Sequence, residues 1–218
     1  MMPVTRVKIC GIATAQDAAA AVALGADALG FLVGLGHEAE DALSAKEAGA
    51  LMATLPPYVA GTLVTHRSRP AEVLDLCRQA HPAVVQLQGD FPLDQIAGLR
   101  AQFPWMKILK TIHVVGETTV AAAMAAARYA DAILLDTRTA TRIGGTGLVH
   151  DWTVSRQVRE ALPAIPVILA GGLTPDNVAR AIATVRPYAV DVNTGVSLRP
   201  ARKSPELMAR FVQAVRHP

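Results

Sequence analysis

Two stretches near opposite ends of the chain decide the fold: Val7-Lys8-Ile9-Cys10-Gly11-Ile12 and Val190-Asp191-Val192-Asn193-Thr194-Gly195-Val196. Each has the pattern of a buried strand that ends in a turn with a reactive residue or a glycine. Strand, turn and helix patterns alternate between them, so the two strands can meet if the sheet closes on itself. Closure would place Cys10 and the turn at Gly195 at one mouth, where a (β/α)8 barrel carries its functional residues.

Eight apolar runs have the pattern of strands, and a helical pattern follows each one. Continuous apolar runs, rather than strict alternation, indicate parallel strands that are buried on both faces. The 218 residues suffice for one such unit, so we predict an α/β protein with a single (β/α)8 TIM barrel domain over 1–218. An open doubly wound sheet has the same alternation, but eight units with short connections favour closure, which leaves no edge strand. The predicted strands are Val7–Ile12, Ala28–Val33, Val59–Thr65, Ala83–Leu87, Met106–Ile112, Ala132–Asp136, Pro166–Ala170 and Ala189–Asn193.

Composition narrows the classes of partner. Aromatic residues make up 4% of the chain, too few for a surface that stacks nucleic-acid bases, and the net charge of +3 is mild. The pI of 9.1 is compatible with an anionic ligand without requiring one. Two distant cysteines give neither metal-ligand spacing nor a disulfide framework. No run approaches the ~20 apolar residues of a membrane span, so we expect a cytoplasmic protein that binds neither nucleic acid nor membrane.

Alternation along the outer strands predicts a buried ion pair. Lys8 shares one face of the first strand with Cys10, and Asp191 shares one face of the last strand with Asn193. These strands are neighbours in a closed barrel, and neither charge should be buried alone. We therefore predict that Lys8 pairs with Asp191 inside the barrel; the alternative is that Lys8 reaches solvent near the bottom of the barrel.

Glycine-containing turns end the last two strands. Gly171 and Gly172 lie just before Thr174-Pro175, which has the pattern of a helix start, and Asn193-Thr194-Gly195 ends the final strand. Glycines allow backbone N–H groups to approach an anion, and the loops after strands seven and eight of a barrel often bind phosphate. We predict a phosphate site at Gly171, Gly172, Asn193, Thr194 and Gly195, although such glycines also serve in turns that bind nothing.

Cys10 and Asp136 are the candidate acid–base pair. Both end apolar strands at the predicted mouth, where a thiolate can act as a base and a carboxyl group as an acid. Cys77 lies within a helical pattern and is expected to be a small buried residue. The segment 142–147, rich in glycine, could close over a ligand or be an ordinary connection. His37 and His150 are expected to be solvated loop residues, since no third metal ligand has suitable spacing.

Several ordered motifs together resemble the phosphoribosylanthranilate isomerase family of tryptophan biosynthesis over essentially the whole chain. The resemblance implies an Amadori rearrangement of a phosphorylated aminoaldose to an aminoketose, without cofactor or metal. It implies Cys10 as the general base at C2 of the ribose, Asp136 as the general acid at the ring oxygen, and phosphate held by backbone amides of the two glycine turns. The motifs are Lys8–Ile12, Gly25–Phe31, Val85–Gly89, Leu134–Thr137, Gly144–Gly147, Gly171–Leu173, Pro175–Val178 and Val185–Val192.

Departures from the family pattern gather at the mouth. The segment Gly34–Asp41 lacks the arginine that holds the anthranilate carboxylate in the family, and Gln88 stands where a histidine is usual. Leu148, His150, Asn193-Thr194 and Ser197 also replace usual residues. We predict that Arg67, Gln88 and Gly145 contact the substrate. One of Arg67, Arg69 and Arg142 would supply the missing cation, with Arg67 as the first candidate.

Three functions remain open from the sequence. The chain is a phosphoribosylanthranilate isomerase, a paralogue that isomerises a different phosphorylated aminosugar, or a barrel that binds a phosphorylated metabolite without turnover. Retention of both Cys10 and Asp136 favours catalysis on a small phosphorylated sugar derivative, and the expected assembly is a monomer or homodimer.

Overall fold

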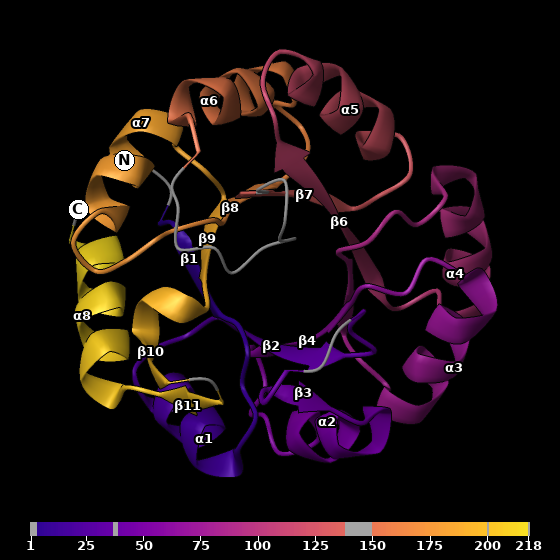
Figure 1. The fold of residues 1–218 in the computed structure, drawn as a ribbon, viewed down its shortest axis with the longest axis horizontal. Coiled ribbons are helices and arrows are strands. Elements are labelled where there is room, and N and C mark those ends of the chain that lie inside the picture. The colour runs from indigo at the N-terminus through magenta and orange to yellow at the C-terminus, as the bar shows by residue number, and fades with distance from the viewer. Residues whose placement is uncertain (1–3, 37–38, 138–149, 200, 218) are drawn as a thin grey trace.

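The computed structural model describes residues 4–36, 39–137, 150–199 and 201–217. Within these ranges eight parallel strands close into a barrel in the order β1-β9-β8-β7-β6-β5-β4-β2, and β2 pairs back with β1 (Figure 1). The short β3 (Ala42–Leu43) lies beside the end of β2. All eight predicted strands are present, which confirms the (β/α)8 fold. They are β1 (Arg6–Ile9), β2 (Ala28–Val33), β4 (Ala60–Thr65), β5 (Val84–Leu87), β6 (Lys107–Val114), β7 (Ala132–Thr137), β8 (Val167–Leu169) and β9 (Ala189–Val192).

Helices surround the barrel and cover the outer face of the strands (Figure 1). Side-chain caps start four of them, α1, α2, α6 and α8, in which an oxygen of Thr14, Ser44, Asp151 or Ser204 accepts from a backbone N–H of the first turn. The bounds are α1 (Ala15–Ala23), α2 (Ala45–Met52), α3 (Pro70–Ala80), α4 (Ile96–Gln102, after the 3-10 turn η1 at Leu93–Gln95), α5 (Thr118–Ala127), α6 (Trp152–Ala161), α7 (Val178–Val185) and α8 (Pro205–Arg216).

The predicted helix start at Thr174-Pro175 is wrong, because α7 begins only at Val178. The side chain of Asn177 explains the difference. Its Oδ1 accepts from Thr174 N at 2.9 Å, and its Nδ2 donates to Gly172 O at 2.9 Å. These two bonds close a separate turn before the helix, as Asn side chains commonly do.

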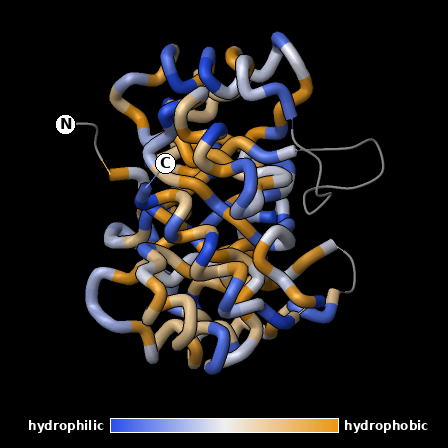
Figure 2. The backbone as a smooth tube through the Cα atoms, turned by 90° about the vertical axis from the view of Figure 1, so that its left-hand side faces the viewer, coloured by the Kyte–Doolittle hydropathy of each residue, from blue (hydrophilic) through white to orange (hydrophobic). Residues whose placement is uncertain are grey.

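The two faces of the barrel wall carry different residues, because successive side chains of a strand point to opposite sides. The outer face of the strands packs against the helices to form the main hydrophobic core, and Figure 2 shows hydrophobic segments crossing the middle of the molecule. A smaller apolar cluster lies inside the barrel. It comprises Leu109, Leu134, Ile168, Ala170 and Ala189 from β6, β7, β8 and β9 and the residue after β8. Strands β1, β4, β5, β6, β7 and β9 also carry buried polar side chains.

Lys8 and Asp191 form an ion pair inside the barrel. They are partners in the parallel register of β1 and β9, and Lys8 Nζ lies 2.8 Å from Asp191 Oδ2. Their exposed fractions are 5% and 7%. The predicted pairing is confirmed, and the alternative of a solvated Lys8 is wrong.

After β9 the chain forms an element that the sequence did not predict. The 3-10 turn η2 (Thr194–Val196) leads into β10 (Ser197–Arg199), which pairs antiparallel with β11 (Arg202–Lys203) before α8.

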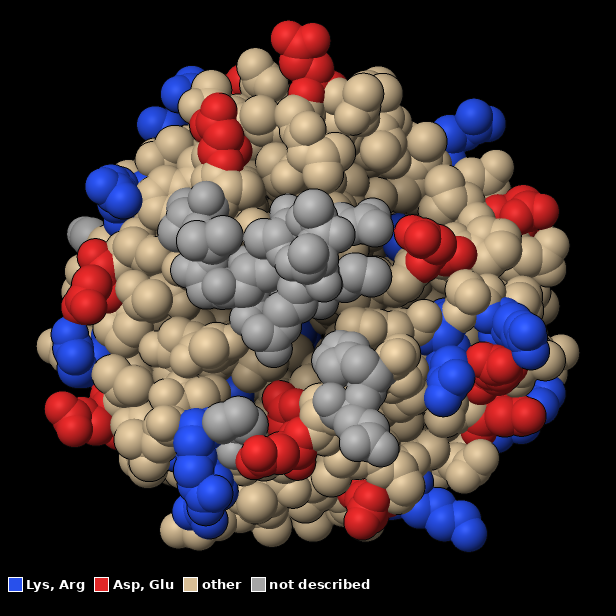
Figure 3. All heavy atoms as spheres, viewed as in Figure 1, with Lys and Arg blue, Asp and Glu red and all other residues tan. Residues whose placement is uncertain are grey.

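Acidic and basic side chains are interspersed around the face of the molecule seen in Figure 3. In the part of the chain that the structure describes, no helix has the length and apolar character that crossing a membrane requires.

Candidate active site

Cys10 follows β1 at the inner wall of the barrel. Its backbone N–H donates to Val192 O at 2.8 Å, which extends the pairing of β1 with β9, and the residue is 6% exposed. Gly30 on β2 leaves room for the thiol, because a Cβ there would lie 2.7 Å from Cys10 Sγ and 3.1 Å from Lys8 Nζ. The thiol and the Lys8 ammonium therefore share the space beside Gly30.

The protonation of Cys10 depends on burial and on neighbouring charges. Burial raises the pKa of the Cys10 thiol above its ordinary value, while the Lys8 cation acts in the opposite direction. Burial alone would lower the pKa of Lys8, but Asp191 and Cys10 together outweigh it and raise that pKa. Lys8 therefore keeps its charge and is available to stabilise a thiolate at Cys10.

Asp136 lies on β7, and both of its carboxyl oxygens accept hydrogen bonds. Gln88 Nε2 donates to Oδ2 at 2.9 Å, and the backbone N–H of Thr137 donates to Oδ1 at 2.8 Å. The residue is 8% exposed. Burial raises the pKa of Asp136 to about 6, although the hydrogen bonds from Gln88 and Thr137 oppose this shift. A carboxyl group with this pKa is partly protonated near neutral pH and can serve as a general acid.

Gln88 is held in one orientation by its neighbours. Its Oε1 accepts from Gln86 Nε2 and from Thr111 Oγ1, each at 2.8 Å, so its Nε2 points at Asp136. Sequence analysis predicted Gln88 only as a substrate contact. The structure shows that it also contacts Asp136, the candidate acid.

The two glycine turns predicted to bind phosphate lie side by side. Gly171 and Gly172 have positive φ angles of 84° and 66°, a conformation that favours glycine. A Cβ at Gly171 would collide with Thr137 Oγ1, and one at Gly195 would collide with Leu173 O. The contact of Gly195 with Leu173 joins the turn after β9 to the turn after β8, so the predicted phosphate residues form one surface.

Lys203 is a buried residue near this surface that sequence analysis missed. Its Nζ donates to Asn193 Oδ1 at 2.6 Å, to Asn193 O at 3.2 Å and to Ser197 Oγ at 3.0 Å. The Asn193 side chain in turn lies over Gly11, where a Cβ would approach its Oδ1 to 2.5 Å. Only the β10–β11 hairpin brings Lys203 here, and no pattern in the sequence marks that hairpin.

Arg67 lies at the rim, against the loop that follows β2. A Cβ at Gly34, the first residue after β2, would lie 3.1 Å from both Cγ and Nε of Arg67. The Arg67 side chain is 48% exposed, and its Nε lies 3.9 Å from Glu72 Oε2. Arg67 therefore presents a partly solvated cation beside the start of the loop that follows β2.

His150 is not a solvated loop residue, so that prediction is wrong. Its Nδ1 lies 3.0 Å from Thr137 Oγ1, and its Nε2 lies 2.6 Å from Ser155 Oγ. Burial lowers the pKa of His150 to about 4, which keeps the ring neutral near pH 7. The other candidates in this region, His37, Arg142, Gly145 and Leu148, lie outside the described residues.

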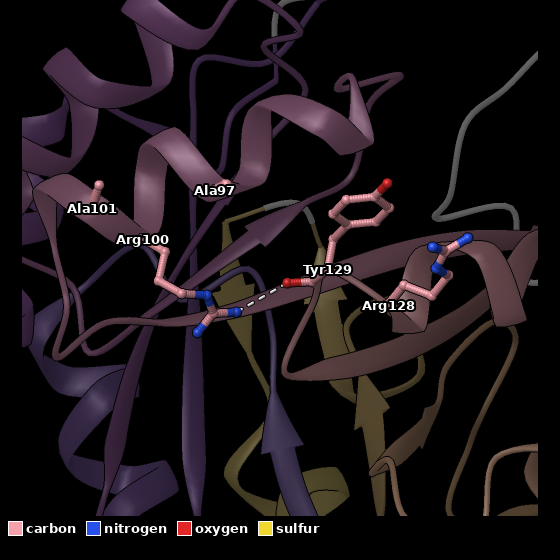
Figure 4. Close-up of a pocket in the computed structure, with 5 residues that line it drawn as sticks. All are labelled: Ala97, Arg100, Ala101, Arg128 and Tyr129. Carbon is pink, nitrogen blue, oxygen red and sulfur yellow. Dashed lines mark hydrogen bonds between the residues drawn. The ribbon is translucent and has the colours of Figure 1, made fainter.

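A surface hollow of about 360 Å³ lies on the outside of the barrel, away from Cys10 and Asp136. Figure 4 shows its lining residues on α4 and at the end of α5: Ala97, Arg100, Ala101, Arg128 and Tyr129. Arg100 is committed to structural partners there, because its Nη2 donates to Tyr129 O at 2.9 Å and to Asp131 Oδ2 at 3.1 Å. Among the described residues, no group of three or more histidine, cysteine or acidic side chains is arranged to hold a metal ion.

The closed barrel, with a thiol and a carboxyl group buried at its mouth, defines an enzyme of the (β/α)8-barrel class. A profile of the N-(5'-phosphoribosyl)anthranilate (PRA) isomerase family matches residues 7–214. The chain belongs to this family, which confirms the resemblance seen in the sequence.

Relatives with this activity match along nearly their whole length. The N-(5'-phosphoribosyl)anthranilate isomerase of Methanocella arvoryzae is 44% identical over 212 residues, which cover 97% of this chain and 98% of the relative. That of Halobacterium salinarum is 43% identical over 214 residues, covering 95% and 94%. The crystal structure of the Thermotoga maritima isomerase superposes with a TM-score of 0.86 at 33% identity, covering 98% of this chain and all of that one.

Proposed function

We propose that this chain isomerises N-(5'-phosphoribosyl)anthranilate to the corresponding aminoketose by an Amadori rearrangement. The observation that carries the proposal is the presence of both a thiol and a raised-pKa carboxyl group at the mouth of a barrel of this family. A related isomerase, 30% identical with a TM-score of 0.83, was crystallised with reduced 1-(o-carboxyphenylamino)-1-deoxyribulose 5-phosphate. That compound is a phosphorylated sugar derivative of the class proposed here.

Asp136 and Cys10 divide the proton transfers between them. Asp136 donates its proton to the furanose ring oxygen, the bond from that oxygen to C1 breaks, and the nitrogen lone pair forms a C1–N double bond. The Cys10 thiolate then removes the proton from C2, the electron pair of that C–H bond forms the C1–C2 double bond of an enolamine, and the C1–N π pair returns to nitrogen. The 2-hydroxyl proton passes to the Asp136 carboxylate and the Cys10 thiol returns a proton to C1, which gives the ketone and restores both groups, so the reaction is an isomerisation with no net gain or loss of atoms.

The phosphate is proposed to bind to backbone N–H groups of the turns after β8 and β9. Support comes from the positive φ angles of Gly171 and Gly172 and from the contact of Gly195 with Leu173 O. Backbone donors can approach an anion closely where no side chain intervenes. Thr194, in the same turn as Asn193 and Gly195, completes the proposed site, and Gly145 remains a proposed substrate contact in the loop after β7.

Arg67 is proposed to hold the anthranilate carboxylate. Its position against Gly34 and its partial exposure support this role. A charge-assisted hydrogen bond contributes about 1.5–3 kcal/mol, so Arg67→Ala is expected to raise KM roughly 10- to 100-fold with little change in kcat. Arg69→Ala is the matched control, because Arg69 is a neighbouring cation whose side chain is 82% exposed. An unchanged KM in Arg67→Ala would contradict the assignment.

The deciding experiment is an isomerase assay on the purified protein. Phosphoribosylanthranilate is generated in situ from anthranilate and phosphoribosyl pyrophosphate, and its loss is followed by fluorescence. We expect turnover that Cys10→Ser and Asp136→Asn each reduce by at least about 100-fold, the lower range for removal of a general acid or base. A folded protein without turnover on this substrate would refute the proposal, and full activity in either variant would refute that residue's role.

The proposed assembly is a monomer or homodimer, and the proposed location is the cytoplasm. Among the related structures is one of monomeric forms of the dimeric Thermotoga maritima isomerase. Sedimentation equilibrium of this chain over a range of protein concentrations distinguishes the two states, and a higher oligomer would contradict the proposal.

A further inference from the structure

Lys203 is a fully hydrogen-bonded ammonium group buried beneath the turn after β9. It is 2% exposed, and its Nζ has three acceptors, Asn193 O, Asn193 Oδ1 and Ser197 Oγ. These match the three donors of a protonated lysine. The backbone N–H of Lys203 also donates to Asp17 Oδ2 on α1 at 3.3 Å, so the residue is fixed at both ends.

All three acceptors of the Lys203 ammonium are uncharged. Within residues 4–36, 39–137, 150–199 and 201–217, no carboxylate oxygen lies within 4.0 Å of its Nζ, whereas Lys8 has Asp191 at 2.8 Å. A buried cation without a counter-ion is costly, and such sites in proteins are frequently functional. The cost is accounted for if an anion forms nearby during the reaction.

The groups that act on Lys203 identify that anion. Burial lowers the pKa of Lys203, and the nearby acidic groups that oppose this effect are, in order, Cys10, Asp41, Asp191 and Asp17. Cys10 in turn is influenced by Lys8, then Asp191, then Lys203. Cys10 is therefore the one thiol on which both the Lys8 and the Lys203 cations act, each lowering its pKa.

A direct line of contacts also connects Lys203 to the backbone of the thiol. The ammonium holds Asn193 Oδ1, and the Asn193 carboxamide covers Gly11, the residue after Cys10. Gly11 has a φ of 70°, and a side chain there would displace Asn193. Lys203 thus fixes the turn after β9 against the peptide that carries Cys10.

We propose that Lys203 is a positioning residue that supplies the second cation for the Cys10 thiolate and fixes the Asn193 turn over Gly11. This deepens the proposed isomerase function and rests on it for the role of Cys10. Lys8 provides the first cation but shares its charge with Asp191. Lys203, on β11, provides one with no carboxylate oxygen within 4.0 Å of its Nζ among the described residues, and it lies behind the Asn193 side chain that covers Gly11.

The test measures the titration of Cys10 itself and therefore does not depend on turnover. The chain has two cysteines, and Cys77→Ala leaves Cys10 as the single thiol. NMR of protein labelled with ¹³Cβ-cysteine then follows one resonance as a function of pH. An opposite charge about 4–6 Å away shifts a pKa by about 1–3 units. Lys203 lowers the pKa of Cys10 through its charge alone, so we expect Lys203→Met to raise the midpoint by about one unit, the lower end of that range.

Three further variants separate charge from structure. Lys203→Gln keeps a donor for Asn193 without the charge and should show the same upward shift, which keeps the test decisive if Lys203→Met does not fold. Lys203→Arg keeps the charge and should restore the original midpoint. Ser197→Ala removes one acceptor of the ammonium and leaves its charge, so its midpoint should equal that of the parent.

Two results would overturn the inference. One is an unchanged Cys10 midpoint in folded Lys203→Met or Lys203→Gln, and the other is an equal upward shift in Ser197→Ala. Failure of the isomerase assay in the parent protein would instead refute the proposed function, and the NMR midpoints would still report whether Lys203 acts on the thiol.

Discussion

Replacing Gln88 by methionine should shift the pH dependence of the reaction towards alkaline pH. Gln88 Nε2 donates to Asp136 Oδ2 at 2.9 Å, and this bond favours the charged carboxylate. A hydrogen bond to a charged group contributes about 1.5–3 kcal/mol, and 1.36 kcal/mol corresponds to one pKa unit. Loss of the donor should therefore raise the pKa of Asp136 from about 6 to roughly 7–8.

The sign follows from the role of Asp136 as an acid. The reaction requires the protonated carboxyl group, so kcat/KM falls as pH rises through its pKa, and a higher pKa moves this descending limb to higher pH. The assay is kcat/KM measured from pH 5 to 9, supported by ¹³C NMR of the aspartate carboxyl carbons. Methionine is close to glutamine in size and has no N–H donor.

Thr111→Val is the control for this prediction. It removes a donor to Gln88 Oε1 but keeps the donation from Gln88 to Asp136. The descending limb should stay where it is in the parent protein, even if the free energy of unfolding falls. The reasoning would be refuted if the descending limb of the kcat/KM profile of Gln88→Met stays at the pH of the parent protein or moves to lower pH.

Three further variants test the barrel wall and the phosphate turn. Gly30→Ala places a methyl group 2.7 Å from Cys10 Sγ, so kcat should fall at least about 10-fold. The overpacking should also lower the free energy of unfolding by about 1–3 kcal/mol. A kcat equal to that of the parent protein would contradict this prediction. Lys8→Met leaves Asp191 buried without its cation and should lower the free energy of unfolding, measured in urea, by about 3–5 kcal/mol. The double variant Lys8→Met/Asp191→Leu removes the unpaired charge and should recover much of that loss. Equal stabilities of the single and double variants would exclude a penalty for the buried charge. Gly172→Ala, at a φ of 66°, should raise KM without moving the pH profile, and a KM unchanged from the parent would remove this turn from the phosphate site.

The fold was predictable because each strand is buried on both faces. Continuous apolar runs do not depend on side-chain contacts, so the eight strands could be placed without knowing how they pack. The pair of Lys8 and Asp191 followed from alternation along two strands that closure makes neighbours. Closure was thus enough to predict one long-range contact between particular side chains.

The site was predictable only in part, because several of its contacts depend on local backbone geometry. Nothing in the sequence indicates that Gln88 is oriented by Gln86 and Thr111, since these three side chains meet only across β5 and β6. Lys203 reaches Asn193 through a short hairpin with no strand pattern. His150 looked like a loop residue because its partners Thr137 and Ser155 lie in different elements.

The closing contact between β1 and β9 also has a consequence for folding. Lys8 and Asp191 are 183 residues apart in the sequence, so their pairing requires the largest loop closure of any strand pair in the barrel. Contacts of such high sequence separation form late, because their entropic cost must be met before they stabilise the chain. A chain in which the other strands have already associated would therefore still expose Cys10 and leave Lys8 without Asp191. Pulse labelling of Cys10 during refolding should show protection appearing last, together with the final rise in native structure.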